Sequence, residues 1–455
     1  MTANHWIQNA VFYHIYPLGF TGAPLSNDFI SQPLPRLDKI AAWVDHMQSL
    51  GVTALYLGPV FESSSHGYDT ADYYSVDRRL GTNATLKYLS DVLHTHGIRL
   101  ILDAVFNHVG RDFWAFRDVQ AHREDSPYPS WFANLRFDQT SPYNDPFSYE
   151  SWNGHYNLVK LNLSNPQVRD HLFNAIQFWM CEFNIDGLRL DAADCLDFDF
   201  LSELSTYCRK IRPDFWLLGE VIHGDYRNWA NPTMLDSVTN YECFKGLYSS
   251  HADANYFEIA YALNRQFGPE GIYRHLPLYS FADNHDVDRV ASSLIDPSHL
   301  FTLYLLLFTM PGVPSIYYGS EWGIQAIKDR NSDLPLRPNL DLAHMIQTAP
   351  QPDLPRAIAA LSSIRSKSPA LTAGEYRQIC VSHQQFVFLR EAPSEKFVIA
   401  INSSKEPTSI DLTFPQNFGN RLRDLLNPGD VFTIQENRCI LPLPANWGRI
   451  LRVSA

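Results

Sequence analysis

The strongest constraint on how this chain can fold is a repeated alternation of short apolar runs with helical patterns. Eight runs have the length and composition of strands, and each is followed by a helix or a helix-sized segment. The strands are expected over residues 11–17, 52–60, 98–105, 185–190, 215–220, 237–241, 278–283 and 313–318. The run 98–105 is mostly apolar, as in strands buried on both faces. Eight such units over about 370 residues predict an α/β fold, a (β/α)8 TIM barrel.

The intervening helices are predicted from apolar stripes and from residues that end helices. Residues 36–50 would bury one face, made of Ile40, Trp43, Val44, Met47 and Leu50. Gly51 follows directly, as is typical of a helix end. Further helices are expected over 86–96, 166–183, 198–211, 257–267, 298–310 and 356–367. A doubly wound sheet is the alternative, but the glycine-rich turn that normally follows its first strand is missing after residue 17.

Two segments depart from this alternation. Residues 107–160 are rich in Pro, Ser, Asn and aromatic residues without a long period, which predicts an inserted domain after the third strand. After about residue 371 the apolar residues alternate with polar ones, as in a small antiparallel β domain. We therefore expect a catalytic barrel over 1–106 and 161–370, an inserted domain B over 107–160 and a C-terminal β domain over 371–455.

Composition excludes several classes of partner and compartment. The chain has 49 acidic and 36 basic residues, a net charge of −13, which disfavours nucleic acids and anionic membranes. Its most apolar stretch, 300–316, contains two prolines and a glycine, so we do not expect a membrane span. The six cysteines form no CxxC pair, and the N-terminus lacks a secretion signal. These features predict a cytoplasmic protein with reduced thiols, and they leave its oligomeric state open.

Charged residues gather where the predicted strands end. In a barrel of this type the C-terminal strand ends carry the functional side chains. The residues concerned lie in DAVFNH, GLRLDAAD, LLGE and FADNHD, and they are Asp103, His108, Arg189, Asp191, Glu220, His285 and Asp286. A ring of helix caps and salt bridges is the structural alternative, but four acidic strand ends at one face favour a catalytic site.

The chemistry that these residues suggest is glycoside hydrolysis. A retaining mechanism needs a nucleophile and a proton donor whose carboxyl groups lie about 5–5.5 Å apart. Asp191 and Glu220 end neighbouring strands, which lie about 4.8 Å apart. Arg189 would point to the same face as Asp191 and keep it ionised. The nearby negative charge of Asp286 would raise the pKa of one partner, as a proton donor requires.

Taken together, these motifs resemble the four signature regions of the α-amylase superfamily of glycoside hydrolases. GYDTADYY at 67–74 and GVPSIYYGSE at 312–321 are also similar to that family. The resemblance spans nearly the whole chain and implies Asp191 as nucleophile, Glu220 as general acid/base and Asp286 as transition-state stabiliser. It further implies that the sugar at the cleaved bond is held by Tyr68, Asp103, Arg189, His108 and His285, with Tyr68 stacked beneath the ring.

Departures from the family pattern bear on metal binding. Classical members carry Lys-His after the nucleophile, and the His carbonyl helps to bind a structural calcium ion; Asp194 and Cys195 stand at those positions. Asn107 is a remaining ligand of that site, but one ligand does not make a site. The segment after the first strand also lacks the DxNxDG metal loop of a related branch. We therefore expect no obligatory metal and no cofactor.

Other segments narrow the expected substrate. SWNGHYNLVKLN at 151–162 and GEVIH at 219–223 resemble the neopullulanase and cyclomaltodextrinase branch, in a short form without its N-terminal β domain. This implies a retaining hydrolase of α-1,4 bonds in short or cyclic maltooligosaccharides, with α-1,6 cleavage left open. The alternatives are an endo-acting α-amylase on starch, a transglycosylase, and a non-catalytic relative, which the three acids disfavour. Residues 328–338 either line the subsites or form a solvated loop.

Overall fold

In the structure, a computed structural model that describes residues 5–330 and 332–454, eight parallel strands form one sheet. They are β1 (Phe12–Ile15), β2 (Ala54–Leu57), β5 (Arg99–Ala104), β9 (Gly187–Leu190), β10 (Trp216–Gly219), β11 (Ser237–Val238), β12 (Tyr279–Phe281) and β13 (Val313–Tyr317). The sheet order is β11-β10-β9-β5-β2-β1-β13-β12. A single parallel bridge between Thr239 and Tyr279 joins its two ends. The predicted (β/α)8 barrel is therefore confirmed.

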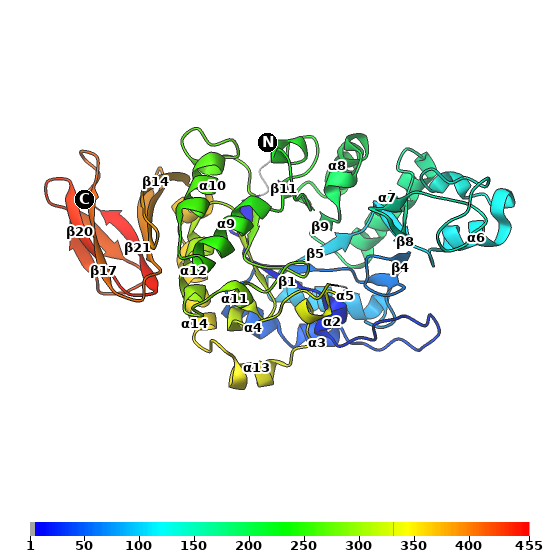
Figure 1. The fold of residues 1–455 in the computed structure, drawn as a ribbon, viewed down its shortest axis with the longest axis horizontal. Helices are drawn as coiled ribbons and strands as arrows, with labels where there is room; N and C mark the ends of the chain where they lie inside the picture. The colour runs from blue at the N-terminus through cyan, green and yellow to red at the C-terminus, as the bar shows by residue number, and fades with distance from the viewer. Residues whose placement is uncertain (1–4, 331, 455) are drawn as a thin grey trace.

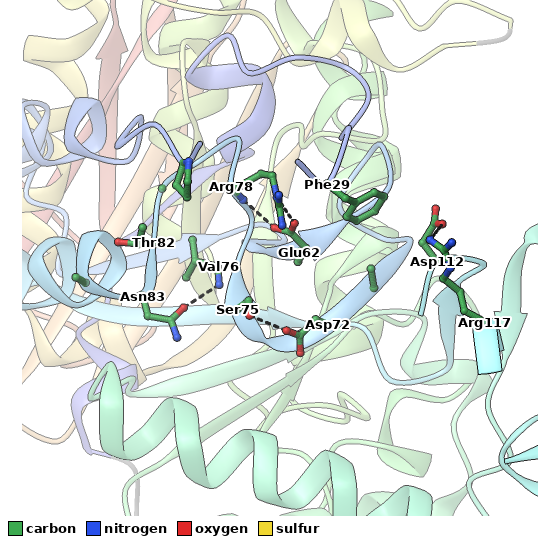
Figure 2. A pocket seen from close by; sticks show the side chains of 14 residues that line it. Phe29, Glu62, Asp72, Ser75, Val76, Arg78, Thr82, Asn83, Asp112 and Arg117 are labelled. Carbon is green, nitrogen blue, oxygen red and sulfur yellow. Dashed lines mark hydrogen bonds and ion pairs between the residues drawn. The ribbon is translucent and has the colours of Figure 1, made fainter. Parts of the chain in front are cut away.

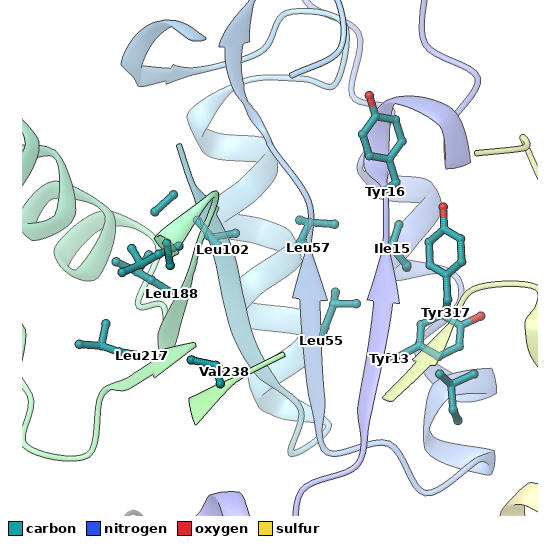
Figure 3. Packing of buried hydrophobic residues seen from close by; sticks show 14 of the residues in the cluster. Tyr13, Ile15, Tyr16, Leu55, Leu57, Leu102, Leu188, Leu217, Val238 and Tyr317 are labelled. Atoms are coloured by element: carbon teal, nitrogen blue, oxygen red, sulfur yellow. The ribbon is translucent and has the colours of Figure 1, made fainter. Parts of the chain in front are cut away.

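Side chains of these strands alternate between two buried faces, as the period of a strand requires. One set fills the inside of the barrel and includes Phe12, Ala54, Ile101, Trp216 and Leu218. The other set packs outward under the helices and includes the labelled leucines of Figure 3. Because both faces are buried, the strands are apolar almost throughout. The inner register becomes important at the C-terminal strand ends, where the apolar side chains give way to polar ones.

Helices surround the barrel strands. The longer ones are α5 (Asn83–Thr95), α7 (Pro166–Glu182), α8 (Phe198–Ile211), α9 (Tyr241–Ala252), α10 (Phe257–Phe267), α12 (His299–Thr309) and α14 (Leu354–Ser366). The shorter ones are α1 (His5–Gln8), α2 (Pro17–Phe20), α3 (Asp38–Ala41), α4 (Val44–Ser49), α11 (Val290–Ser293), α13 (Leu342–Thr348) and α15 (Pro369–Ala373).

One predicted helix is divided in the structure, and one of the longer helices was not predicted. The helix predicted over 36–50 is divided into α3 and α4 around Trp43, whose ring packs edge-on against Phe20 and Trp322. The predicted stripe is nevertheless buried, so the apolar pattern was informative although the backbone turns. Helix α9 was missed, because its sequence places His, Ser and Gly among the apolar residues.

Two insertions extend the barrel at its C-terminal face. A hairpin of β3 (Phe61–Ser63) and β4 (Thr70–Val76) follows β2. After β5 the chain forms a small sheet in the order β6-β8-β7, from β6 (His108–Gly110), β7 (Ser151–Trp152) and β8 (His155–Lys160), together with α6 (Trp114–His122). In Figure 1 this cyan part and the C-terminal strands lie at opposite ends of the molecule.

The C-terminal part consists of two antiparallel sheets. The larger has the order β14-β15-β16-β21-β18-β19 and the smaller pairs β17 with β20. Their bounds are β14 (Glu375–Val381), β15 (Gln385–Ala392), β16 (Glu395–Asn402), β17 (Thr408–Thr413), β18 (Arg421–Asp424), β19 (Val431–Thr433), β20 (Arg438–Leu443) and β21 (Trp447–Ser454). A buried arginine, Arg390, joins this part to the barrel by donating to the carbonyl of Thr309 at 2.6 Å. Within residues 5–330 and 332–454, no helix combines the length and the apolar character that crossing a membrane requires.

Candidate active site

The inner register of the strands brings the predicted acids to one end of the barrel. Counting in twos from the buried Ile101 leads to Asp103, and counting from Leu218 leads to Glu220. On β9 the same face carries Arg189 and then Asp191. Because β5, β9 and β10 are neighbours in the sheet, these four side chains meet at adjacent strand ends.

One guanidinium connects three carboxylates at this place. Nη1 of Arg189 donates to Oδ1 of Asp103 at 2.9 Å and to Oδ1 of Asp191 at 2.8 Å. Nη2 lies 2.8 Å from Oε2 of Glu220. The Arg189 side chain is 4% exposed, whereas those of Asp191 and Glu220 are 11% and 14% exposed. The arginine therefore lies beneath the two acids and leaves each partly open to solvent.

The backbone next to Asp191 is held in an unusual conformation. Ala192 has φ 45° and ψ 45°, the left-handed region that residues with a Cβ rarely occupy. Its N–H donates to Oε2 of Glu220 at 3.0 Å. Such local strain persists where the surrounding structure fixes it and is common at functional sites. Here it aims a backbone donor at the same oxygen that Arg189 contacts.

The third predicted acid, Asp286, lies across this end of the barrel. Its side chain is 33% exposed and its Oδ2 lies 3.1 Å from Nε2 of His285. Arg337, which is almost completely buried, contacts Oδ1 of Asp286 at 2.9 Å and donates through Nε to the carbonyl of His285 at 3.0 Å. Arg337 also contacts Asp333 at 3.0 Å. Asp286 is thus held from two sides while its carboxyl remains accessible.

A hydrogen-bond network links Asp103 to the remaining predicted residues. Its Oδ2 accepts from the hydroxyl of Tyr56 at 2.7 Å and from that of Tyr68 at 3.1 Å. The Tyr68 hydroxyl also contacts Nε2 of His285, and the two rings are stacked with centroids 5.6 Å apart. Tyr68 is supplied by the β3–β4 hairpin, so this insertion places an aromatic ring over the barrel.

His108 approaches the acids from the inserted segment. Its Nε2 lies 3.9 Å from Oδ2 of Asp191 and is buried without a hydrogen-bond partner among the described residues. The amide of Asn107 contacts its other ring nitrogen at 3.2 Å. The ring of Trp152, on β7, lies 5.6 Å from the His108 ring. All eight residues predicted for the site are therefore in or beside one cluster.

Burial dominates the acid–base properties of the cluster. It raises the pKa of Asp191 well above its ordinary value and also raises the pKa of Glu220 and Asp103. Arg189 lowers the pKa of Asp191, as the sequence predicts, but burial and the neighbouring carboxyls act more strongly, so the net direction is upward. The charge of Asp286 further raises the pKa of Glu220. The Asp191–Glu220 pair therefore retains a proton to higher pH than isolated carboxyls do.

The histidines of the cluster are neutral. Burial lowers the pKa of His108 to about 3 and that of His285 well below its ordinary value. Neutral imidazoles have one donor and one acceptor nitrogen each, which suits the hydroxyl groups of sugars. The arrangement combines a proton-sharing carboxyl pair, a third carboxylate, neutral imidazoles and a stacked tyrosine.

Sequence reasoning did not identify Arg337 or Tyr56. Residues 328–338 were interpreted only as a possible subsite wall or a solvated loop, and Arg337 proves to be buried against Asp286. Arg337 differs from a surface arginine only in being buried, and the sequence does not show burial. Tyr56 could have been found, because counting in twos along β2 from the inner Ala54 leads to it.

A second hollow lies apart from these residues. Figure 2 shows this groove, which is about 640 Å³ in volume and is formed by the loop at Phe29, the β3–β4 hairpin, the start of α5 and the inserted segment. Two of its three acids are paired within the groove: Arg78 contacts Glu62 at 2.5 Å and Arg117 contacts Asp112 at 3.3 Å. The third acid of the groove, Asp72, contacts no base among the described residues and accepts hydrogen bonds from Tyr74 and Ser75.

The residues that bear on metal binding are Asn107 and Cys195. In the part of the chain that the structure describes, no three or more His, Cys, Asp or Glu side chains are grouped as metal ligands. The side chain of Asn107 lies against His108, and Cys195 is exposed.

Comparisons with known proteins show which family the chain belongs to. Residues 15–346 match the family described as alpha amylase, catalytic domain. The chain is 31% identical over 460 residues to neopullulanase 2 of Thermoactinomyces vulgaris, covering 94% of this chain and 75% of that protein. It is 30% identical over 423 residues to a cyclomaltodextrinase of a Bacillus species, covering 88% and 74%.

Solved structures show the same relationship. The cyclic α-maltosyl-(1→6)-maltose hydrolase of Arthrobacter globiformis superposes with a TM-score of 0.83 at 27% identity, and each chain is covered completely. The match to the catalytic domain includes every strand end that carries the carboxylate cluster. By sequence, fold and relatives alike, this chain belongs to the α-amylase family of glycoside hydrolases.

Proposed function

We propose that this enzyme is a retaining hydrolase of α-1,4-glucosidic bonds in short or cyclic maltooligosaccharides. The observation that carries the chemistry is the contact of one guanidinium, Arg189, with the carboxyls of both Asp191 and Glu220. It holds two acids side by side, as a double-displacement mechanism requires. We also propose domain limits of 1–106 and 161–370 for the barrel, 107–160 for domain B and 371–455 for the C-terminal domain.

In the first step, a carboxylate oxygen of Asp191 attacks the anomeric carbon while Glu220 gives its proton to the glycosidic oxygen. The bond from the anomeric carbon to that oxygen breaks, and a glycosyl ester of Asp191 remains. Glu220 is suited to hold this proton because burial and Asp286 raise its pKa. Asp191 must be ionised at this moment, so the shared proton of the pair resides on Glu220.

In the second step, Glu220 removes a proton from water, whose oxygen attacks the same carbon and releases Asp191. Two inversions give net retention. Asp286 stabilises the positive charge that develops on the sugar ring in both steps. Tyr68 stacks beneath that ring, and Asp103, His108, Arg189 and His285 hold its hydroxyls or position the acids.

The preference for short or cyclic substrates is supported by the relatives. The Arthrobacter globiformis enzyme, whose structure matches the chain over its whole length, is named as a hydrolase of cyclic maltosyl-maltose. Two sequence relatives are named for cyclomaltodextrin and pullulan substrates. The substrate of the maltosyl-maltose hydrolase contains a 1→6 linkage by name, so cleavage of α-1,6 bonds by this enzyme stays open.

Two measurements test this function. Proton NMR of the first product should show the α-anomer; initial release of the β-anomer would exclude a covalent intermediate on Asp191. The kcat/KM values for cyclodextrins, maltotriose, panose, pullulan and soluble starch, expressed per cleavable chain, should favour the short and cyclic substrates. A clear preference for starch would make the enzyme an endo-acting α-amylase, and dominant transfer products would make it a transglycosylase.

A further inference from the structure

A buried imidazole lies beneath the candidate site and has no part in the mechanism above. His14 is on β1, in register with Tyr56 of β2 and Tyr317 of β13. It is 2% exposed, and its ring stacks on that of Tyr56 with centroids 4.2 Å apart. It meets the ring of His285 almost perpendicularly, with centroids 5.1 Å apart. His14 therefore touches both the Asp103 network, through Tyr56, and the histidine beside Asp286.

The partners of His285 define which of its nitrogens carries the proton. Its Nε2 contacts the hydroxyl of Tyr68 and lies 3.1 Å from Oδ2 of Asp286. The Tyr68 hydroxyl gives its own proton to Asp103, so it accepts from His285, and the Asp286 carboxylate can only accept. The proton of the neutral ring is therefore on Nε2. Nδ1 is left as an acceptor that needs a donor.

One nitrogen of each ring is buried without a hydrogen-bond partner. Nδ1 of His285 and Nε2 of His14 are both buried and lack a hydrogen-bond partner among residues 5–330 and 332–454. Buried polar atoms of this kind normally have a partner, and each exception calls for an explanation. Burial lowers the pKa of His14, so its ring is neutral and can carry its single proton on Nε2.

The distance between the two rings is short enough for a hydrogen bond between Nε2 of His14 and Nδ1 of His285. An N–H···N hydrogen bond of about 3 Å between facing imidazoles places their centroids roughly 5 Å apart. The observed 5.1 Å meets this requirement. The bond requires a rotation of the His14 ring about χ2 and none of His285, whose Nε2 contacts stay in place. The other rings around His14, Tyr56 and Tyr317, use their hydroxyls for Asp103 and for the carbonyl of Leu336.

From this geometry we propose that His14 is a positioning residue that donates from Nε2 to Nδ1 of His285. The bond fixes the His285 tautomer whose Nε2–H points toward Tyr68, Asp286 and the sugar hydroxyls. Without it, His285 can move its proton to Nδ1 and offer a lone pair where the site needs a donor. The inference rests on the proposed function for the role of His285, but the tautomer itself can be observed without any substrate.

Three substitutions of His14 test whether a hydrogen-bond donor is needed at the position of its Nε2. The side-chain amide of His14→Gln can place a donor near the Nε2 position, whereas His14→Asn places it near Nδ1, and His14→Phe keeps a ring without a donor. We expect His14→Gln to retain kcat/KM within about threefold. His14→Asn and His14→Phe should lose about 10–100-fold, the range found when supporting hydrogen bonds of functional histidines are removed. Melting temperatures of the Gln and Asn variants show whether both remain folded.

A spectroscopic measurement separates this inference from the proposed function. In 15N spectra of histidine-labelled protein, with His285 assigned through His285→Gln, one tautomer should be seen in the unsubstituted enzyme and in His14→Gln. Mixed tautomers are expected in His14→Asn. If the enzyme cleaved no α-glucan, the proposed function would fail while these spectra still tested the hydrogen bond. Equal kcat/KM for the Gln and Asn variants, or a single tautomer in both, would overturn the role of His14.

Discussion

The carboxylate cluster and the groove of Figure 2 are built from the same residue types but differ in how their charges are matched. In the groove, Glu62 contacts Arg78, Asp112 contacts Arg117 and the third acid, Asp72, accepts hydrogen bonds from Tyr74 and Ser75, so no two acids share a base. In the cluster, one guanidinium serves Asp103, Asp191 and Glu220 together. The groove is also open, whereas the cluster lies at the inner register of the barrel.

This difference separates a surface hollow from a site that performs chemistry. Excess carboxylates in a buried place raise one another's pKa, and buried ring nitrogens there lack partners. None of the residues that line the groove has a buried polar atom without a partner among the described residues. The candidate site is distinguished by buried polar groups that lack partners and by carboxyls that share one base, and not by the size of a hollow.

The largest expected effect is loss of cleavage on removal of either catalytic acid. Asp191→Asn and Glu220→Gln should each reduce kcat by about three orders of magnitude or more, because the covalent or the proton-transfer step is removed. Steady-state rates on a maltooligosaccharide measure this loss. The groove variants Asp72→Asn and Arg117→Gln are matched controls and should stay within about twofold. Near-normal turnover of either acid variant would refute the assignment.

A smaller loss is expected from Arg337→Gln. The substitution removes the 2.9 Å contact with Asp286 and the bond to the His285 carbonyl, but leaves the Asp191–Glu220 pair intact. We expect kcat/KM to fall about 10–100-fold, because Asp286 loses its orientation. The same change at the exposed Arg117 is the control. Equal kcat/KM values for the two variants would show that Arg337 does not orient Asp286 for catalysis.

The third prediction concerns stability and its dependence on pH. Because the pKa of Asp191 is raised in the folded protein, folding favours its protonated form, and stability falls as pH rises from the unfolded-state pKa through the folded-state pKa. Asp191→Asn lacks this loss. Its melting temperature should exceed that of the unsubstituted enzyme by about 2–4 °C at pH 7, and the difference should shrink toward pH 4.

The groove supplies the control for this experiment. Asp72→Asn changes a half-exposed carboxyl that accepts hydrogen bonds from Tyr74 and Ser75, so no gain in melting temperature at pH 7 is expected. Calorimetric scans at several pH values measure both variants. A gain for Asp191→Asn that is equal at pH 4 and pH 7 would contradict the raised pKa.

The smallest effect is expected on treatment with a chelator. By the family resemblance, Cys195 stands at the position of a His that helps to bind calcium, and a bound metal would stabilise the folded state according to its affinity. EDTA should therefore shift the melting temperature by less than about 2 °C. A larger decrease that calcium restores would show that a metal site was overlooked.

Much of the fold could be predicted because barrel strands and their helices have clear periods. The mostly apolar run over β5 and the stripe that ends at Gly51 needed no tertiary information. The cluster could be anticipated as well, because the inner register of a strand extends to the residues that follow it. Asp103 and Glu220 are in phase with Ile101 and Leu218, and the sequence alone contains that count.

The remaining features depend on contacts between segments far apart in the chain. Arg337 is separated from Asp286 by about fifty residues, and only folding distinguishes it from a solvated arginine. The strained backbone at Ala192 has no signal in the sequence, since alanine normally avoids this conformation. The unpartnered nitrogens of His14 and His285 become visible only when both rings are placed.

The closure of the barrel has a consequence for motion. Seven neighbouring strand pairs are joined by ladders, but β11 and β12 meet through the single bridge between Thr239 and Tyr279. Local opening follows the places with the fewest hydrogen bonds, so amide exchange should be fastest at this seam. Glu220 follows β10, next to β11, and Asp286 follows β12 on the other side. Thermal opening of the seam would therefore change the separation of these two acids while leaving Asp191 and Glu220 together.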